Sequence, residues 1–414
     1  MKILVRKLST AVFIPAVFLS AGLVQADECP LIEPSLESTW DLHSRVISVD
    51  THVDIDPEYA TASMDPGGFT NSQNDLPKMR AGGLDAVFLI LYTGQDTLDD
   101  YGYAKARAMA EKKYRAITRL TRAYPDQIGL ATSADEVRQL HEQGKKIALI
   151  GMENAYPLGN SVDDVALWAE RGVRYVSLTH IGHNQFGGSS NPRPDLGDDD
   201  NDPGLTELGK ELVHALNEHG IMVDVSHVGR RTMLEATQLS TAPVIASHSG
   251  VKGVHDNLRN LDDEQLDAIA ESGGVAHMVA FRSYVAEVDL AIEEGTRKLA
   301  EEHLADGWEN AAPEQIQAFM AGIRELRRKH DDVNVQQFVD HIDYAVERMG
   351  IEHVGISSDF DGGGGVAGWD DASETVNVTR ELMRRCYSED DIRALWGENL
   401  LRVLDDVRAS ANRL

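Results

Sequence analysis

Short apolar, β-branched runs recur along the chain and alternate with amphipathic stretches. Two of them, Ile221–Val225 and Val244–Ala246, each end at a Ser-His pair. Continuous apolar runs of this length are typical of parallel strands that are buried on both faces. The stretch between them, Arg230–Ser240, has a helical pattern. We therefore predict one right-handed βαβ unit, in which the strand ends, with His227 and His248, point the same way.

Six further runs of the same kind extend this pattern over most of the chain. Eight strands that alternate with helices in one chain of 414 residues predict a single (β/α)8 domain, a TIM barrel. The six other predicted strands are Val46–Val49, Ala86–Leu91, Lys146–Ile150, Tyr175–Leu178, Gly274–Phe281 and His353–Ser358. The other predicted helices are Ser35–Ser44, Tyr101–Tyr124, Val162–Arg171, Thr206–His219, Asp262–Glu271 and Val335–Met349.

Two segments lie outside this alternation. Ser283–Asp332 is charged and helical in pattern, which predicts a helical insertion after the seventh strand. On a barrel this insertion lies at the carboxyl face, so we expect it to roof the active site. Asn191–Gly204 is acidic and rich in turn residues. It lacks the spacing and the terminal Glu of a calcium loop, so we interpret it as a mobile loop at the rim of the barrel.

The first 26 residues have the pattern of a secretory signal peptide. Three basic residues precede the apolar run Ala11–Val24, which ends at the small-x-small cleavage site Val24–Ala26. We therefore expect cleavage near Ala26, a mature domain over residues 27–414, and a periplasmic or secreted product. No other stretch is long and apolar enough to span a bilayer, so we expect no membrane anchor.

The net charge limits the kinds of partner that the protein can bind, and the cysteine count bears on whether a disulfide forms. The chain carries a formal net charge of −29, and removing the three basic residues of the signal lowers it to about −32. Such acidity argues against nucleic acid or an anionic membrane as a partner. Cys29 and Cys386 are the two cysteines. In an oxidising compartment we expect a disulfide between them, with two free thiols as the alternative.

Residues that can bind a metal or a substrate follow nearly every predicted strand. In a TIM barrel these strand ends meet at one face, where the active site lies. Imidazole and carboxylate ligands without thiolate favour zinc, with manganese or cobalt as alternatives. The pattern therefore predicts a barrel of the metal-dependent hydrolase type, acting on an amide or an ester. The residues at the strand ends are, in chain order, His52 and Asp54, Tyr92, Glu153, His180, His227, His248 and Asp359.

The spacing suggests how two metal ions would be held. Residues i and i+2 of a strand face the same way, so His52 and Asp54 can share one ion. His227 and His248 would hold the other, and Glu153 would bridge the two. A water between two such ions loses its proton near neutral pH and becomes a nucleophilic hydroxide.

Two strand-end residues then remain for catalysis. Asp359 would take the proton from the water and return it to the leaving group. His180 would donate to the developing oxyanion. His183 and His277 have no role in this scheme, and we interpret both as structural or as outer partners that support the site residues.

The sequence closely resembles the membrane (renal) dipeptidases, dizinc (β/α)8 metallopeptidases that cleave dipeptides. The resemblance covers almost all of the mature chain. The motifs that carry it are D-T-H-V-D (50–54), G-M-E-N-A (151–155), L-T-H (178–180), M-V-D-V-S-H-V (222–228), P-V-I-A-S-H-S (243–249), R-N (259–260) and G-I-S-S-D-F-D-G (355–362).

The resemblance implies a role for each candidate residue. It makes His52, Asp54, Glu153, His227 and His248 the ligands of two Zn2+ ions, with Glu153 as the bridge. It makes His180 and Arg259 substrate-binding residues and Asp359 the proton carrier. Arg259 would pair with the terminal carboxylate of the dipeptide through its planar fork. We add Tyr92 to the substrate-binding residues because it ends the second strand.

Several points stay open at the level of sequence. The side chain and the configuration of the substrate are undetermined, because some bacterial relatives act on dipeptides with a D-configured carboxyl-terminal residue. A hydrolase of N-acyl amino acids or lactones on the same metals is the alternative function, although Arg259 argues against a lactone. An acidic metal-binding or scaffold protein is a weaker reading. The end Arg408–Leu414 is polar, so we expect that the lipid anchor of the animal members is absent, and a homodimer is compatible with the sequence.

Overall fold

Eight parallel strands form the centre of the molecule, in the order β1-β2-β4-β5-β6-β7-β8-β9. The computed structural model describes residues 33–305, 311–330 and 332–411. A parallel bridge joins Val53, at the end of β1, to Phe360, just after β9. The sheet therefore closes into a barrel, which confirms the predicted fold. The strands are β1 (Val49–Val53), β2 (Ala86–Ile90), β4 (Lys146–Met152), β5 (Val173–Ser177), β6 (Met222–Asp224), β7 (Ile245–Ser249), β8 (Val275–Val279) and β9 (Val354–Ser357).

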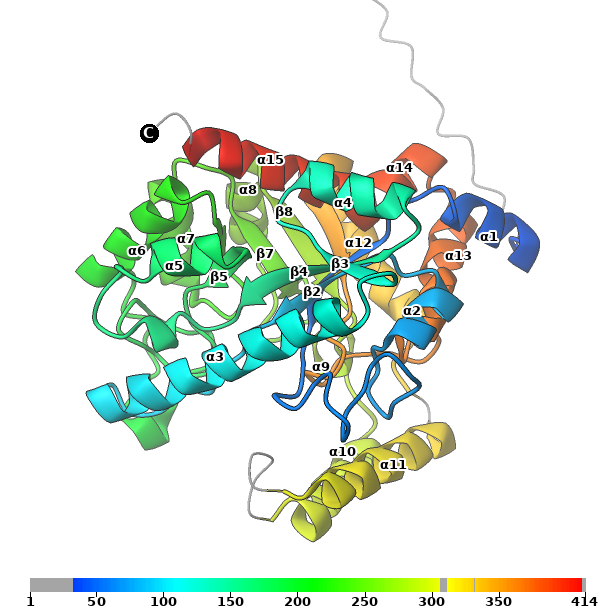
Figure 1. Cartoon of the computed structure of the whole chain (residues 1–414), viewed down its shortest axis with the longest axis horizontal. Helices are drawn as coiled ribbons and strands as arrows, with labels where there is room; N and C mark the ends of the chain where they lie inside the picture. Colours follow the sequence, from blue (N-terminus) through cyan, green and yellow to red (C-terminus); the bar gives the residue numbers. More distant parts are fainter. Residues whose placement is uncertain (1–32, 306–310, 331, 412–414) are drawn as a thin grey trace, which may run out of the picture.

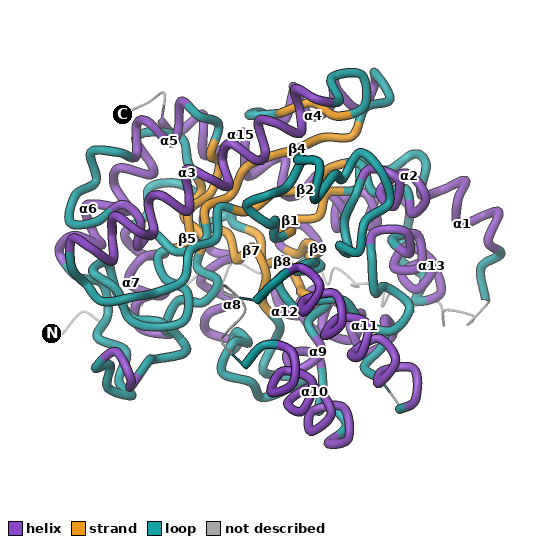
Figure 2. The backbone as a smooth tube through the Cα atoms, turned by 60° about the horizontal axis from the view of Figure 1, so that its bottom comes forward, coloured by secondary structure: helices purple, strands orange, loops and turns teal. Residues whose placement is uncertain are grey.

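Helices surround this barrel and cover its outer face (Figures 1 and 2). Those that follow the strands in the regular alternation are α2 (Leu76–Gly82), α3 (Asp100–Ala123), α5 (Val165–Glu170), α6 (Glu207–Glu218), α7 (Arg230–Leu239), α8 (Asp263–Glu271) and α12 (Val335–Met349). The others are α1 (Leu36–His43), α4 (Ala134–Glu142), α9 (Arg282–Val285), α10 (Leu290–His303), α11 (Pro313–Lys329), α13 (Val376–Arg384), α14 (Glu389–Arg393) and α15 (Asn399–Ala411).

The strands are apolar on both faces because both faces are covered. Along β2, the side chains of Phe88 and Ile90 belong to one buried cluster, and those of Val87 and Leu89 belong to another. The ring of Phe88 lies 5.0 Å from that of Tyr175 on β5, although β4 separates the two strands. Phe88 therefore faces the barrel interior, and its neighbours along the strand face the helices.

The structure corrects several bounds of the predicted elements. The first strand is Val49–Val53, so it contains His52 instead of ending before it, and β7 likewise runs through His248. A ninth strand, β3 (Ile128–Leu130), was missed. It pairs with β4 away from the closed path, and three residues with a central glycine are too few to give a pattern.

The predicted insertion after the seventh strand contains α9 and a helical hairpin of α10 and α11. The hairpin stands out from the barrel on the side of α9 (Figures 1 and 2). Its helices pack closely at Gly295, where an added Cβ would lie 2.4 Å from Leu326. At its base, Arg282 forms ion pairs with Asp332 at 2.8 Å and with Asp370 at 2.7 Å. That this hairpin covers the active site remains a prediction.

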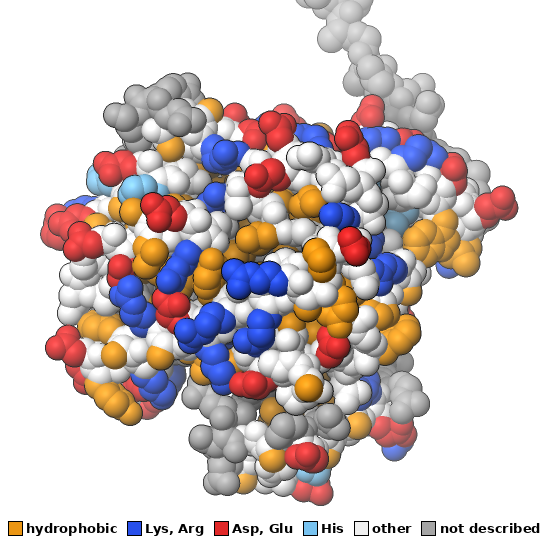
Figure 3. Space-filling model, in the orientation of Figure 1, with side chains coloured by type: hydrophobic (Ala, Val, Ile, Leu, Met, Phe, Trp, Pro, Cys, Tyr) orange, Lys and Arg blue, Asp and Glu red, His pale blue; other side chains and the backbone are white. Residues whose placement is uncertain are grey.

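The structure describes only some of the residues on which the predicted signal peptide and disulfide depend. The signal peptide and Cys29 lie outside the described residues, whereas Cys386 takes part in a disulfide. Within the described ranges, no helix combines the length and the apolar character needed to cross a bilayer. On the face drawn in Figure 3, basic side chains gather near α3, and acidic ones lie mostly toward the edges.

Candidate metal centre

The predicted ligands converge at the carboxyl ends of β1, β4, β6 and β7. His52 and His248 lie within their strands, and Asp54, Glu153 and His227 follow the ends of theirs. Ligand atoms from these residues, together with His180 and Asp359, form three overlapping groups whose atoms lie within 4.8 Å of one another. The groups are His52, Glu153 and His248; Glu153, His180 and His227; and His52, Asp54 and Asp359.

Glu153 occupies the middle of this cluster. Its Oε1 lies 3.1 Å from Nε2 of His227 and 3.3 Å from Nε2 of His248. Its Oε2 lies 3.5 Å from Nε2 of His52, whose Nε2 is also 3.6 Å from Oδ2 of Asp54. The two oxygens of one carboxylate thus face two different sets of ligands, which is the arrangement that a bridging ligand requires.

The donor atoms fit divalent cations. Nε2 of His52 is buried and has no hydrogen-bond partner among the described residues, although it faces two carboxylates. Burial holds the pKa of His227 and His248 well below the usual range, which favours the neutral ring that binding to a metal requires. Their Nε2 atoms lie 2.8 Å apart, close enough to share one ion. A metal would therefore satisfy groups that the protein leaves pointed at one another.

Left-handed backbone shapes the loops that carry three of the site residues. His227 has φ 66°, Asp359 has φ 58°, and Asn154, next to Glu153, has φ 74°. Residues other than glycine seldom adopt this conformation, and it persists where the surrounding structure enforces it, often at functional sites. The turns let the chain bend sharply at the strand ends while the side chains stay in the barrel mouth.

Asp359 lies at the end of β9 and faces the ligands of the β1 side. Burial raises the pKa of Asp359 well above its usual range; His52 opposes this rise, whereas Asp54 adds to it. Asp361 turns away and accepts the N–H of Gln73 at 2.8 Å. The structure therefore separates the two aspartates, with Asp359 at the site and Asp361 in the loop.

The predicted substrate-binding residues line the same mouth. Arg259 is 4% exposed, donates through Nη2 to the carbonyl of His248 at 3.0 Å, and lies over the ring of Tyr284 at 5.2 Å. The ring of Tyr92 lies 4.7 Å from that of His180 in an edge-on arrangement. Residues from both sides of the barrel thus approach the candidate metal centre.

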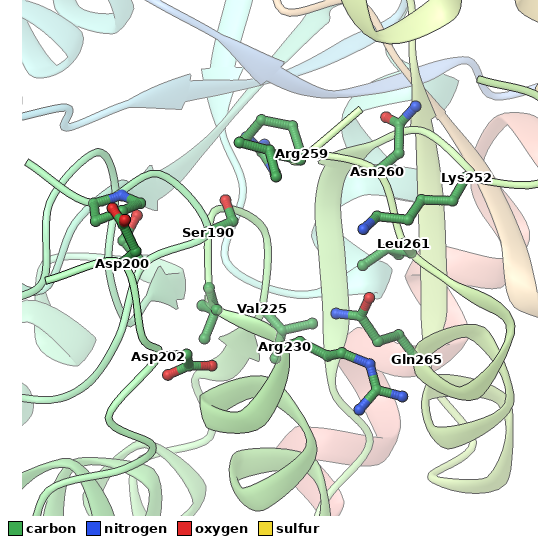
Figure 4. A pocket seen from close by; sticks show the side chains of 15 residues that line it. Ser190, Asp200, Asp202, Val225, Arg230, Lys252, Arg259, Asn260, Leu261 and Gln265 are labelled. Atoms are coloured by element: carbon green, nitrogen blue, oxygen red, sulfur yellow. The ribbon is translucent and has the colours of Figure 1, made fainter. Parts of the chain in front are cut away.

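A cavity of about 160 Å³ lies beside Arg259, between the loops that follow β5, β6 and β7 (Figure 4). The acidic loop predicted at the rim contributes Asp200 and Asp202 to its wall. Lys252 and Arg230 also line it, and the candidate metal ligands do not. The cavity is therefore a neighbour of the candidate site and is separate from its metal-binding groups.

The two histidines interpreted as structural make contacts away from the cluster. His277 is buried in β8, its Nδ1 donates to the carbonyl of Ala246 at 3.0 Å, and burial lowers its pKa to about 4. Nδ1 of His183 accepts the N–H of Ser189 at 3.0 Å within the loop after β5. Neither belongs to the metal-binding groups found among the described residues.

Sequence reasoning missed Lys113 and Tyr284. Lys113 lies on α3, is buried, and places Nζ 3.5 Å from Oδ1 of Asp54 and 5.1 Å from the ring centre of Tyr92. Tyr284 belongs to the insertion and reaches Arg259. A basic residue on an amphipathic helix carries no signal of its own, because its partner lies 59 positions away in the sequence.

A model of the membrane dipeptidase family, peptidase family M19, matches residues 36–414. The chain belongs to this family. The structure of the probable dipeptidase PvdM from Pseudomonas aeruginosa is 32% identical, with a TM-score of 0.79, over 90% of this chain and 98% of that one. Dipeptidase verJ of Clonostachys rogersoniana is 29% identical over 395 residues, which are 91% of this chain and 88% of its own.

Dipeptidase ataJ of Aspergillus terreus is 30% identical over 363 residues, which are 82% of this chain and 78% of its own. A metallopeptidase from Rhodobacter sphaeroides, liganded with a phosphinate mimic of the dipeptide L-Ala-D-Ala, shares the fold, with 23% identity and a TM-score of 0.68. The membrane dipeptidase family is thus the one that the motifs predicted, and its members are hydrolases of dipeptides.

Proposed function

We propose that this membrane dipeptidase family member hydrolyses free dipeptides with two divalent ions, zinc by preference. The observation that carries the proposal is the position of Glu153, whose two oxygens face different histidines at 3.1–3.5 Å. His52 and Asp54 would hold one ion, and His227 and His248 the other. When bound, the ions would activate a water as nucleophile and polarise the scissile carbonyl.

The chain's own residues would orient the substrate and move the proton. Asp359 faces the ligands of the β1 side from the end of β9, so it can take the proton of the attacking water and pass it to the departing amine. His180 faces Oε1 of Glu153 and would donate to the developing oxyanion. Arg259 is buried beside His248, where it would bind the terminal carboxylate.

The proposal is tested by metal content and by a panel of substrates. Purified protein should retain two metal ions per chain after dialysis, measured by elemental analysis, and Glu153→Gln should lose at least one. The substrate panel compares L-L dipeptides, L-D dipeptides, N-acyl amino acids and a lactone at equal concentration. Hydrolysis of N-acyl amino acids or lactones in preference to every dipeptide would reject the dipeptidase assignment.

We also propose that the protein is exported and that its signal peptide is cleaved near Ala26. The basic and apolar pattern of residues 1–26 supports this. Mass spectrometry of the protein from the periplasm or the medium should give the mass of residues 27–414. The mass of the full chain in the cytoplasmic fraction alone would reject export.

A further inference from the structure

A hydrogen-bond chain beneath the candidate ligands ends at a buried carboxylate. Nδ1 of His248 lies 2.8 Å from Oγ of Ser247, and this hydroxyl donates to Oδ2 of Asp224 at 2.6 Å. Oδ1 of Asp224 also accepts the N–H groups of Ser226 at 3.0 Å and Ser247 at 2.9 Å. With three donors around it, Asp224 acts as an acceptor. The proton of Ser247 therefore points to Asp224, and Oγ accepts the Nδ1–H of His248.

A second chain supports a histidine of the other half of the site. Nδ1 of His52 lies 2.9 Å from the hydroxyl of Tyr175, which donates to the carbonyl oxygen of Thr51 at 3.0 Å. A carbonyl can only accept, so the hydroxyl must accept the Nδ1–H of His52. Gly151 makes room for this ring, because a Cβ there would lie 2.3 Å from Tyr175.

We propose that Ser247 and Tyr175 are positioning residues that fix the tautomer and the ring orientation of two metal-binding histidines. Ser247 acts with Asp224 on His248, and Tyr175 acts on His52. Each chain keeps a proton on Nδ1 and leaves the lone pair of Nε2 directed at the cluster around Glu153. Partners of this kind raise the basicity of a metal-bound imidazole and hold its ring in place.

His227 provides a contrast within the same site. Nδ1 of His227 is buried and, in the part of the chain that the structure describes, has no hydrogen-bond partner. His52 and His248 stand on strands, whereas His227 follows β6 in a left-handed turn. The hydrogen-bond chains through Ser247 and Tyr175 thus support His248 and His52, the two histidines that lie within strands. The inference rests on the metal centre proposed above.

The test is the affinity of the purified protein for zinc, measured by competition with a chromophoric chelator. Ser247→Ala and Tyr175→Phe should each weaken the binding of zinc about 10- to 100-fold, the usual effect of removing an outer partner of a ligand. Ser247→Thr keeps a hydroxyl and should restore the affinity. Ser357→Ala is the matched control, because Ser357 is a buried strand serine whose Oγ has no hydrogen-bond partner in the portion of the chain that is described.

Cobalt substitution gives a second readout, because the visible spectrum of bound Co2+ reports ligand geometry. The spectrum should change in Ser247→Ala and Tyr175→Phe and stay unchanged in Ser357→Ala. If Ser247→Ala does not fold, Tyr175→Phe, which loses only a hydroxyl, still decides the question for His52. Zinc affinity equal to that of the wild type in folded variants would overturn this inference alone. A wild type that binds no zinc would overturn the proposed function together with it.

Discussion

The pairing of Arg259 with the terminal carboxylate of the substrate can be tested by changing both partners. Arg259 is 4% exposed, and its Nε is buried and has no hydrogen-bond partner within the described ranges, so one edge of its fork remains available. At such a site, two unit charges 4 Å apart interact with about 4 kcal/mol at an effective dielectric constant of about 20. Removing one partner of a buried charge pair costs about 2–5 kcal/mol.

The measurement is kcat/KM for a free dipeptide and for the same dipeptide with an amidated carboxyl end. For the wild type, the energy above corresponds to a preference of about 30- to 4,000-fold for the free dipeptide. Arg259→Met should reduce this preference to near unity. Arg259 also donates to the carbonyl of His248 at 3.0 Å, and loss of that contact slows both substrates alike, so it cancels in the ratio.

Arg230→Met is the matched control, since Arg230 lines the neighbouring cavity but is already paired with Asp262 and Glu264. It removes the same charge nearby and should leave the preference as in the wild type. A preference that survives in Arg259→Met, or a wild type that cleaves both substrates equally, would refute the role of Arg259. Equal loss of the preference in both variants would show a diffuse charge effect instead of a pair.

Three further predictions concern proton transfer, ligand support and acid stability. Asp359→Asn should lower kcat about 10²- to 10⁴-fold in steady-state kinetics and should keep both metal ions in elemental analysis. Loss of a metal ion in this variant would show that Asp359 is a metal ligand. Lys113→Met should weaken zinc binding about 10- to 100-fold, because Asp54 loses the ion pair that holds it in place. Lys112→Met, on the exposed side of the same helix, should leave zinc binding unchanged. Tighter binding in Lys113→Met would mean that repulsion between Lys113 and the metal ions outweighs its support of Asp54. Burial lowers the pKa of His341 to about 4, below its unfolded value of about 6.5. The neutral ring therefore contributes about 3 kcal/mol to the free energy of unfolding above pH 6.5, and this contribution is lost as the pH falls to 4. In urea unfolding, His341→Gln should lose less stability between pH 6.5 and pH 4 than the wild type does. An equal loss in the two proteins would show that His341 is not a source of the acid sensitivity.

The sequence allowed the fold and the convergence of the candidate ligands to be predicted because both follow from one rule. Parallel strands that share a barrel all end at the same face, so polar residues placed at strand ends must meet there. His227 and His248, at the two Ser-His pairs, and Glu153, after the third predicted strand, illustrate this. Their roles as metal ligands remain predictions, whereas their proximity is a property of the structure.

Residues that act through other residues could not be predicted in the same way. Tyr175 lies in an apolar strand and is indistinguishable from a core residue until its hydroxyl is seen beside Nδ1 of His52. Ser247 looks like the partner of the neighbouring His248, but its function as an acceptor for that ring depends on Asp224 in the adjacent strand, which takes the proton of Ser247. Lys113 reaches Asp54 from a helix. All three depend on tertiary contacts that have no period in the sequence.

The period of two along a strand predicts side-chain direction only while the backbone stays extended. At β1 the rule holds one residue past the strand, and both His52 and Asp54 face the cluster. At β9 it would also direct Asp359 and Asp361 into the mouth together. The strand ends at Ser357, however, and both aspartates adopt left-handed φ angles of 58° and 62°. Each such turn re-aims the chain, so Asp359 stays with the ligands while Asp361 binds the loop after β1. The direction of a residue beyond a strand end is therefore set by the turn, and the turn depends on packing against other loops.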